Sequence, residues 1–200
     1  MMWKRPSVAL PAVGTQVDYL KGSSLAETDR IDMSKQAPTN PLPHIKALAA
    51  AVRLPDQPMA TFRALDAAMD AVIGHSYITI LLYHADLQET ERFYSSNLQA
   101  YPIAGRKDVQ PTGWTEKLLI NQECYIGYDA EDIKEFFFDY ELIHSLGCDA
   151  ILNVPVVYDG VTLGTINLVH EAGWYEESDT DIALTIASIT TPAFLQIAEK

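Results

Sequence analysis

The fold is decided by residues 147–188, which read GCDAILNVPVVYDGVTLGTINLVHEAGWYEESDTDIALTIAS. Residues 150–158 are apolar, β-branched or aromatic apart from Asn153, and residues 161–169 form a second run rich in such residues. The dipeptide Asp159-Gly160 between them is the pair that best supplies the positive φ angles of a two-residue hairpin turn. This stretch therefore predicts two antiparallel strands joined by a tight turn.

A helix is expected directly after the second strand. Glu176, Glu177 and Asp179 stand where the partial positive charge of a helix N-terminus favours anions. We predict a helix over residues 179–199 that bends at Pro192, because proline cannot donate the backbone hydrogen bond of a helix interior.

The segments upstream add strands and helices in an order that fits one sheet. Periodicity and turn residues predict a helix-prone stretch at 45–52, a helix at 59–74 with Gly74 as its C-cap, strands at 77–84 and 91–98 across a turn at 85–88, a loop at 102–111, a short helix at 113–120, a strand at 124–128 and helical turns at 133–146. Strands joined by short turns pair in antiparallel fashion, and helices must cover the faces of the sheet. The predicted fold class is therefore α+β, not a doubly wound parallel sheet.

The N-terminal part differs in composition from the rest. Residues 1–45 hold five prolines and show no sustained periodicity, so we predict a disordered segment at 1–45 and a folded domain at 46–200. Met33 could also serve as the initiating methionine, and we expect translation to begin there.

The chain is acidic, with a formal net charge of −13 over 200 residues. Residues 46–200 carry 23 acidic and nine basic side chains, so no basic stripe is available to contact phosphate backbones. Anionic membranes are disfavoured for the same reason, and the chain has no run of about 18 apolar residues that could span a membrane. We therefore expect neither a nucleic-acid partner nor a membrane partner.

The cysteines and the N-terminus bear on the compartment. Cys124 and Cys148 form neither a disulfide framework nor a metal-ligand pattern, and the first residues lack the apolar core of a secretory signal. We predict a cytoplasmic protein, in which thiols stay reduced, without a metal or other cofactor.

The segments Ile-Leu-Asn-Val-Pro-Val at 151–156 and Gly-Thr-Ile-Asn-Leu at 164–168, with the turn between them, resemble the GAF domain family. Trp174-Tyr175 before the last helix extends the resemblance, which covers residues 58–198. It implies a GAF-like (PAS-like) sheet of five or six antiparallel strands with helices on both faces. The terminal helices would cover one face, and a ligand pocket would lie on the other. GAF domains usually sense small molecules or mediate dimerisation.

One GAF chemistry, the reduction of free methionine-(R)-sulfoxide, needs cysteines at set positions. In that family a cysteine stands two residues after the glycine of the short helix, and here that position holds Thr115. Thiolate attack has no substitute among other side chains. Cys124 falls inside a predicted strand and Cys148 lies directly before one, so we interpret both as small buried hydrophobic residues.

The other GAF chemistries also depend on particular residues. Bilin attachment uses a cysteine followed by histidine, which neither cysteine provides. In the cyclic-nucleotide signature, Leu168 and Thr180 stand where its lysine and glutamate would be. The five histidines show no spacing typical of haem or metal ligands.

If a ligand binds, it should meet apolar walls and a few polar groups. Alternation places Asn153 on one face of its strand and Thr165 with Asn167 on one face of the next, and we expect these faces to line a pocket. Six further candidates come from the helices and loop that would cover it: Trp114, Tyr128, Asp129, Phe138, Tyr140 and His144.

Two features indicate contacts beyond the pocket. Three consecutive phenylalanines at 136–138 cannot all face one way on a helix, so at least one should be exposed, cover a pocket or contact another subunit. The helices at 59–73 and 182–197 offer a homodimer interface, and the second carries a stripe of small and apolar residues: Ala183, Ile186, Thr190, Ala193 and Ile197.

We therefore predict a stand-alone, non-catalytic GAF domain that binds a small organic ligand, forms a homodimer and acts through a separate partner. Two alternatives stay open: a free methionine-(R)-sulfoxide reductase with atypical cysteines, and a structural dimerisation module with a filled core. The sequence does not identify the ligand.

Overall fold

The structure is a computed structural model that describes residues 39–198. Its strands are β1 (Tyr77–His84), β2 (Glu89–Ser95), β3 (Arg106–Asp108), β4 (Tyr125–Gly127), β5 (Ala150–Tyr158) and β6 (Val161–His170). Its helices are α1 (Leu42–Ala51), α2 (Met59–Val72), α3 (Gly113–Thr115), the π-helical turn η1 (Glu116–Ile120), α4 (Ala130–Phe136), α5 (Tyr140–Ser145), α6 (Ser178–Ser188) and α7 (Thr191–Ala198).

The strands form one antiparallel sheet in the order β3-β2-β1-β6-β5-β4. Asp159 and Gly160 join β5 to β6 with φ angles of 50° and 74°, and Tyr158 pairs with Val161 across this turn. The predicted antiparallel sheet and the predicted hairpin are thereby confirmed.

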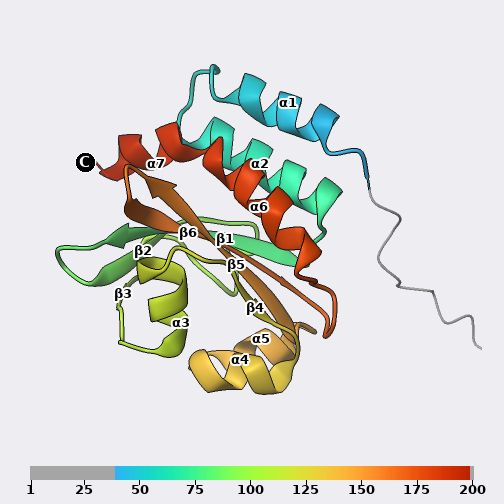
Figure 1. Cartoon of the computed structure of the whole chain (residues 1–200), viewed down its shortest axis with the longest axis vertical. Coiled ribbons are helices and arrows are strands. Elements are labelled where there is room, and N and C mark those ends of the chain that lie inside the picture. The colour runs from blue at the N-terminus through green and yellow to red at the C-terminus, as the bar shows by residue number, and fades with distance from the viewer. Residues whose placement is uncertain (1–38, 199–200) are drawn as a thin grey trace, which may run out of the picture. The chain divides into compact units, whose positions relative to one another are not determined.

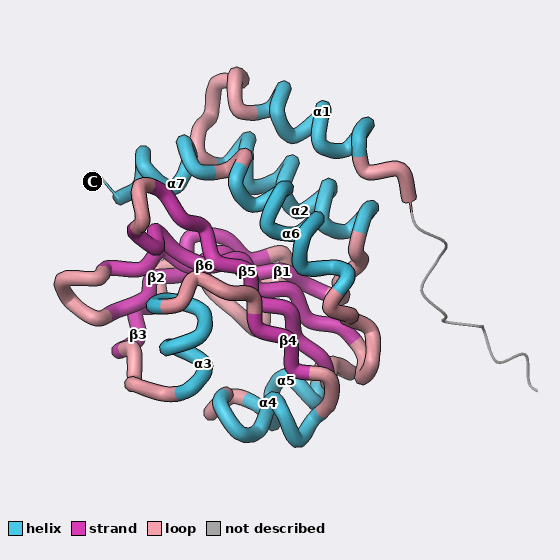
Figure 2. The backbone as a smooth tube through the Cα atoms, in the orientation of Figure 1, coloured by secondary structure: helices cyan, strands magenta, loops and turns pink. Residues whose placement is uncertain are grey.

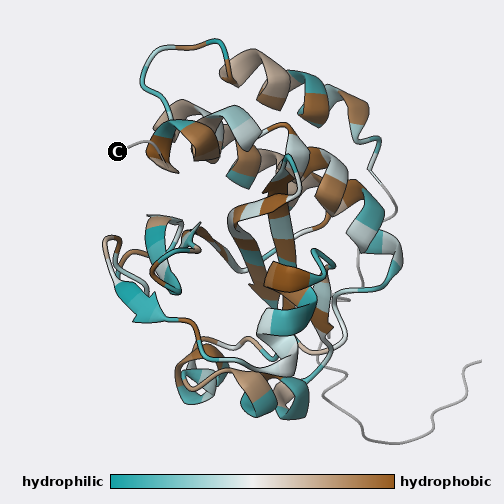
Figure 3. Cartoon of the chain, turned by 60° about the vertical axis from the view of Figure 1, so that its left-hand side comes forward, coloured by the Kyte–Doolittle hydropathy of each residue, from teal (hydrophilic) through white to brown (hydrophobic). Residues whose placement is uncertain are grey.

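Helices cover both faces of the sheet, as predicted. The helices α1, α2, α6 and α7 lie on one face, and α3, α4 and α5 lie on the other (Figures 1 and 2). Alternate residues of the central strands, such as Ile80, Leu152 and Ile166, belong to the core on the α2/α6/α7 side. Figure 3 shows hydrophobic residues concentrated on the central strands and on the helix sides that face them.

The sequence-based prediction is wrong in two segments. The predicted loop at 102–111 contains the edge strand β3, whose three residues are all exposed and therefore carry no hydrophobic alternation. The predicted helical turns at 133–146 form two separate helices, because Phe137 adopts an extended backbone (φ −113°, ψ 110°) and ends α4.

Pro155 occupies a position in β5 that tolerates a missing N–H. The last β5 residue that pairs with β4 is Asn153, so β5 has a free outer side at Pro155. A bulge follows between Val156 and Val157. The proline therefore lies where the strand has both a free outer side and a bulge.

The residue stripe predicted as a dimer interface faces the core of its own chain instead. Ala183, Ile186, Thr190, Ala193 and Ile197 are at most 4% exposed. Their small and apolar side chains let α6 and α7 approach the sheet closely, so this stripe is not free to contact a second copy. The two helices are bent by 56°, close to Pro192 as predicted.

Among residues 39–198, no single helix has both the length and the apolar character needed to cross a membrane. The bent pair α6 and α7 meets those criteria only when its helices are taken together, by length and composition alone.

The predictions for the N-terminal segment are only partly addressed. Residues 1–38, and Met33 among them, lie outside the described residues. The helix α1 begins at Leu42, so the folded domain starts before the predicted boundary at residue 46.

We expect Gly164→Ala to destabilise the fold. A Cβ at Gly164 would contact the backbone carbonyl of Leu81 in β1 and approach the Phe194 ring in α7 to 2.6 Å. Overpacking of this kind costs about 1–3 kcal/mol in the free energy of unfolding, which urea denaturation measures.

Gly105→Ala is the matched control, because no atom lies within 4 Å of its added Cβ and its φ is not in the left-handed region. Its free energy of unfolding should stay within about 1 kcal/mol of the original. Equal stability of the two variants would contradict the close approach at Gly164.

Candidate functional site

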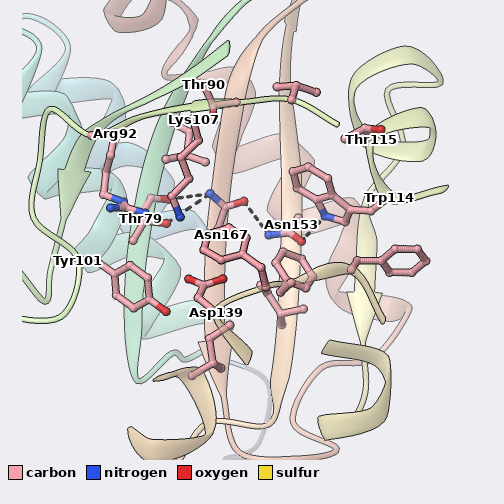
Figure 4. Close-up of a pocket in the computed structure, with 18 of the residues that line it drawn as sticks. Thr79, Thr90, Arg92, Tyr101, Lys107, Trp114, Thr115, Asp139, Asn153 and Asn167 are labelled. Atoms are coloured by element: carbon pink, nitrogen blue, oxygen red, sulfur yellow. Dashed lines mark hydrogen bonds between the residues drawn. The ribbon is translucent and has the colours of Figure 1, made fainter. Parts of the chain in front are cut away.

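A cavity of about 200 Å³ lies on the sheet face opposite the terminal helices. Its floor consists of residues from β1, β5 and β6, and its walls come from β2, β3, α3, the end of α4, the segment 137–139 that follows it, and Ile143 of α5. Figure 4 shows how side chains from these separate elements point into one space. The sheet order brings together residues that are far apart in the sequence.

A row of polar side chains crosses the cavity floor. The strand register places Asn167 beside both Thr79 and Asn153. Trp114 Nε1 donates to Asn153 Oδ1 (2.9 Å), and Asn153 Nδ2 donates to Asn167 Oδ1 (2.6 Å). Asn167 Nδ2 in turn donates to Thr79 Oγ1 (3.3 Å). We call Thr79, Asn167, Asn153 and Trp114 the polar row (Figure 4).

The indole of Trp114 sets the direction of the polar row. An indole N–H can only donate, so Asn153 must turn its amide oxygen toward it. The amide nitrogen of Asn153 then points to Asn167, which offers its oxygen and directs its own nitrogen to Thr79. The second N–H of Asn153 is left over as a donor for a ligand.

Basic and phenolic side chains line the other end of the cavity. The guanidinium of Arg92 lies 5.0 Å from the centre of the Tyr101 ring, and Tyr77 stacks on Tyr101 with 5.2 Å between ring centres. Arg92 Nε is buried here without a hydrogen-bond partner among the described residues, and the hydroxyls of Tyr77 and Tyr101 interact with each other and Tyr101 also with Asp139. Lys107 and Asp139 complete this end.

Burial shifts the pKa values of these groups. It lowers the pKa of the Arg92 and Lys107 side chains, while the negative charge of Asp139 acts in the opposite direction on both. Burial raises the pKa of Tyr101 to about 12, and it also raises the pKa of Tyr77. Both phenols are therefore protonated donors at neutral pH, and the arginine stays charged.

Aromatic rings form the remaining wall and the mouth of the cavity. Trp114 meets Phe137 edge to face, with 5.6 Å between ring centres. Phe138 is 76% exposed, and Lys107 Nζ lies 4.0 Å from the centre of its ring. The prediction that at least one of the three phenylalanines is exposed is confirmed, because the helix break at Phe137 turns Phe138 outward.

The structure brings four of the nine predicted site residues to this cavity: Trp114, Phe138, Asn153 and Asn167. Thr165 lies on the same face of β6 and is buried, and its hydroxyl has no hydrogen-bond partner within residues 39–198, but it does not border the cavity.

The other four predicted residues lie elsewhere. Tyr128 is 42% exposed and donates to Glu177 (2.9 Å), and Asp129 caps the N-terminus of α4. Tyr140 and His144 line a separate hollow of about 310 Å³ beside Cys148, where His144 pairs with Asp149 at 2.7 Å. The expectation that all six helix and loop candidates cover one pocket is therefore corrected. The helix α5 borders the cavity through Ile143, while Tyr140 and His144 line the other hollow.

Sequence reasoning missed Thr79, Tyr77, Arg92, Tyr101, Lys107 and Asp139. Tyr77 and Thr79 alternate with the core residues of β1, which is a signal that could have found them. Arg92 and Lys107 carry no such signal, because β2 is half-buried along most of its length and β3 is exposed.

The cysteines and Thr115 contribute no nucleophile to the cavity. Thr115 borders it, but its hydroxyl donates to backbone carbonyls, including that of Gln110 (3.0 Å), within the capping box of α3. Cys124 and Cys148 are buried and do not line the cavity. In the described part of the chain, no group of three or more histidine, cysteine, aspartate or glutamate side chains is arranged to hold a metal ion.

One antiparallel sheet with helices on both faces and a cavity over its centre defines this chain as an α+β domain. No protein-family model and none of the curated proteins matches the sequence.

Solved structures match it well. The GAF domain of the Acinetobacter phosphoenolpyruvate-protein phosphotransferase has a TM-score of 0.63 at 12% identity, covering 80% of this chain and 97% of that one. The phycocyanobilin-bound GAF domain of a cyanobacterial phytochrome has a TM-score of 0.59 at 13% identity, covering 80% and 96%. The GAF domain of a two-component sensor histidine kinase from Bacillus halodurans has a TM-score of 0.56 at 10% identity, covering 68% and 92%. At these identities the likeness establishes the fold alone, and this chain has the GAF fold.

We expect Trp114→Phe to destabilise the fold, because it leaves the buried Asn153 oxygen without its donor. An unpartnered buried acceptor costs about 1–3 kcal/mol, measurable as a change in the free energy of unfolding. In an Asn153→Val background the same substitution should cost less, because the acceptor is already gone. An equal cost in both backgrounds would show that the hydrogen bond is not responsible.

Proposed function

We propose that this chain is a non-catalytic sensor domain that binds a small organic ligand in the cavity above the polar row. A separate partner protein would carry the output. The GAF domains of the histidine kinase and of the phytochrome noted above belong to sensory proteins, which supports a sensory role for a chain of the same fold.

The observation that carries the proposal is the cavity itself, about 200 Å³ lined by charged, phenolic and aromatic side chains, together with a donor of Arg92 that is unpartnered in the described part of the chain. Arg92 Nε is buried at this site and lacks a hydrogen-bond partner in residues 39–198, while the hydroxyls of Tyr77 and Tyr101 interact with each other and Tyr101 also with Asp139. An unmade buried hydrogen bond costs about 1–3 kcal/mol, so the unpartnered donor favours a site that is filled by another molecule. A structural module with a filled core gives no reason for this space.

The proposal of a non-catalytic role rests on the thiols. Burial raises the pKa of Cys124 to about 12 and also raises the pKa of Cys148. A raised pKa removes the thiolate that sulfoxide reduction needs. The same buried thiols suit the reducing cytoplasm that we propose as the compartment.

A homodimer through the terminal helices also stays a proposal. Since the stripe on α6 and α7 is buried, its contact would use the outer sides of these helices or of α1, where Leu42 is 65% exposed.

The ligand proposal predicts that the purified protein, incubated with an extract of cellular small molecules, retains a small non-protein mass in native mass spectrometry. Thr90→Trp places a large ring at the half-buried edge of the cavity and should abolish this retention. Thr185→Trp, the same substitution on the exposed side of α6, is the control and should not affect it. Absence of any retained mass, or retention by the Thr90→Trp variant, would contradict the proposal.

The non-catalytic proposal predicts slow alkylation of Cys124 in the native chain. At about pH 8, a thiol whose pKa rises from 9.0 to about 12 holds roughly a thousandfold less thiolate. Iodoacetamide should therefore label Cys124 at least about a hundredfold more slowly in the native chain than in urea, as followed by mass spectrometry. Turnover of free methionine sulfoxide that is lost in Cys124→Ser or Cys148→Ser variants would overturn the non-catalytic role.

A further inference from the structure

The size of the cavity limits its occupant. Pockets for drug-sized ligands measure about 300–1,000 Å³, whereas an engineered cavity of about 150 Å³ holds benzene. A cavity of about 200 Å³ therefore suits a molecule with one ring and one small substituent. The rings of Trp114 and Phe137 supply an apolar wall for such a ring.

The cavity presents the donors of Arg92 and Lys107 and one carboxylate, that of Asp139. Arg92 Nε lacks a partner among the described residues, whereas the hydroxyls of Tyr77 and Tyr101 interact with each other and Tyr101 also with Asp139. The oxygens of Asn153 and Asn167 already accept hydrogen bonds within the polar row. A ligand that satisfies this site must therefore bring acceptors.

The charges in the cavity also favour a ligand that brings hydrogen-bond acceptors. Arg92 and Lys107 face it from β2 and β3, and the carboxylate of Asp139 faces them (Figure 4). Asp108 also borders the cavity, but alternation along β3 directs its side chain to the opposite face, with Arg106 and Glu89. Two cations and one carboxylate leave one positive charge to be neutralised.

We propose that the ligand is a single-ring organic monoanion, whose carboxylate binds Arg92 and Lys107 and whose ring lies against Trp114 and Phe137. A guanidinium and a carboxylate form charge-assisted hydrogen bonds of matching geometry. A phosphate dianion would overcompensate the single positive charge, so a carboxylate is the better match. This inference rests on the proposed function, since it names the ligand class of the same cavity.

Three ring compounds of similar size and different charge test the ligand class: benzoate, benzamide and benzylammonium. Ligand-detected NMR titrations at neutral pH measure their affinities for the full chain. Benzoate should bind about tenfold more tightly than benzamide, because charge-assisted hydrogen bonds are about twice as strong as neutral ones. Benzylammonium should bind no better than benzamide. Equal affinities of benzoate and benzamide would overturn the inference.

Charge variants then locate the anion. Arg92→Gln should weaken benzoate about tenfold while changing benzamide by less than about twofold. Asp139→Asn removes the opposing charge and should strengthen benzoate severalfold. Arg106→Gln is the matched control, because Arg106 pairs with Glu89 (3.4 Å) and Glu91 (2.8 Å) on the other face, and it should leave all three affinities unchanged. A preference for benzoate that survives Arg92→Gln would also overturn the inference.

The two proposals can fail separately. If benzamide binds as well as benzoate and Thr90→Trp blocks both, the ligand class is wrong and the ligand-binding cavity stands. If Thr90→Trp leaves benzoate binding unchanged, the cavity is not the site, and the proposed function fails together with this inference.

Discussion

The structure depends on one row of hydrogen bonds that crosses the centre of the sheet, from Trp114 through Asn153 and Asn167 to Thr79. Two asparagines are buried side by side on adjacent strands, and each unpartnered amide would cost about 1–3 kcal/mol. The row satisfies them and ties three central strands to α3, the helix that stands over the cavity. Because the indole can only donate, one side chain orients both amides.

The edge strands β2 and β3 carry paired charges on the face away from the cavity and, among the described residues, unpaired positive charges on the cavity face. On the outer face, Arg106 is neutralised by Glu89 and Glu91. On the cavity face, neither Arg92 nor Lys107 takes part in any ion pair found within residues 39–198. In a chain of net charge −13, a half-buried arginine without an ion-pair partner is costly to keep, since desolvation opposes its charged form. Aromatic rings and the more distant Asp139 offset only part of that cost.

The sheet and the cavity floor could be predicted from the sequence, whereas the basic end of the cavity could not. A strand has a period of two, so alternation grouped Asn153 and Asn167 with the residues on their own strand faces. The hairpin turn alone would set Asn153 opposite Ile166, and the bulge between Val156 and Val157 shifts the register by one residue so that the two asparagines pair. Arg92 and Lys107 lie beside this floor because the strand order places β2, and then β3, beside β1, and no local sequence pattern predicts that order. The edge strand β3 is short and exposed, so nothing distinguished it from a loop. The candidates Tyr140 and His144 lie outside the cavity for a related reason: after the backbone break at Phe137, α5 borders the cavity with Ile143 and a separate hollow with these two residues.

Both faces of β6 are constrained by their neighbours, which explains why the sequence of this strand is so informative about the fold. One of its faces must supply Asn167 to the polar row, and the other must pack against the terminal helices through Ile166 and Leu168. Gly164 belongs to that second face and lies so close to β1 and to Phe194 of α7 that no side chain fits. Protein interiors are close-packed, so a residue on one face of this strand cannot shift without moving those on the other. The strand that holds the floor of the cavity is therefore also the strand against which the terminal helix packs.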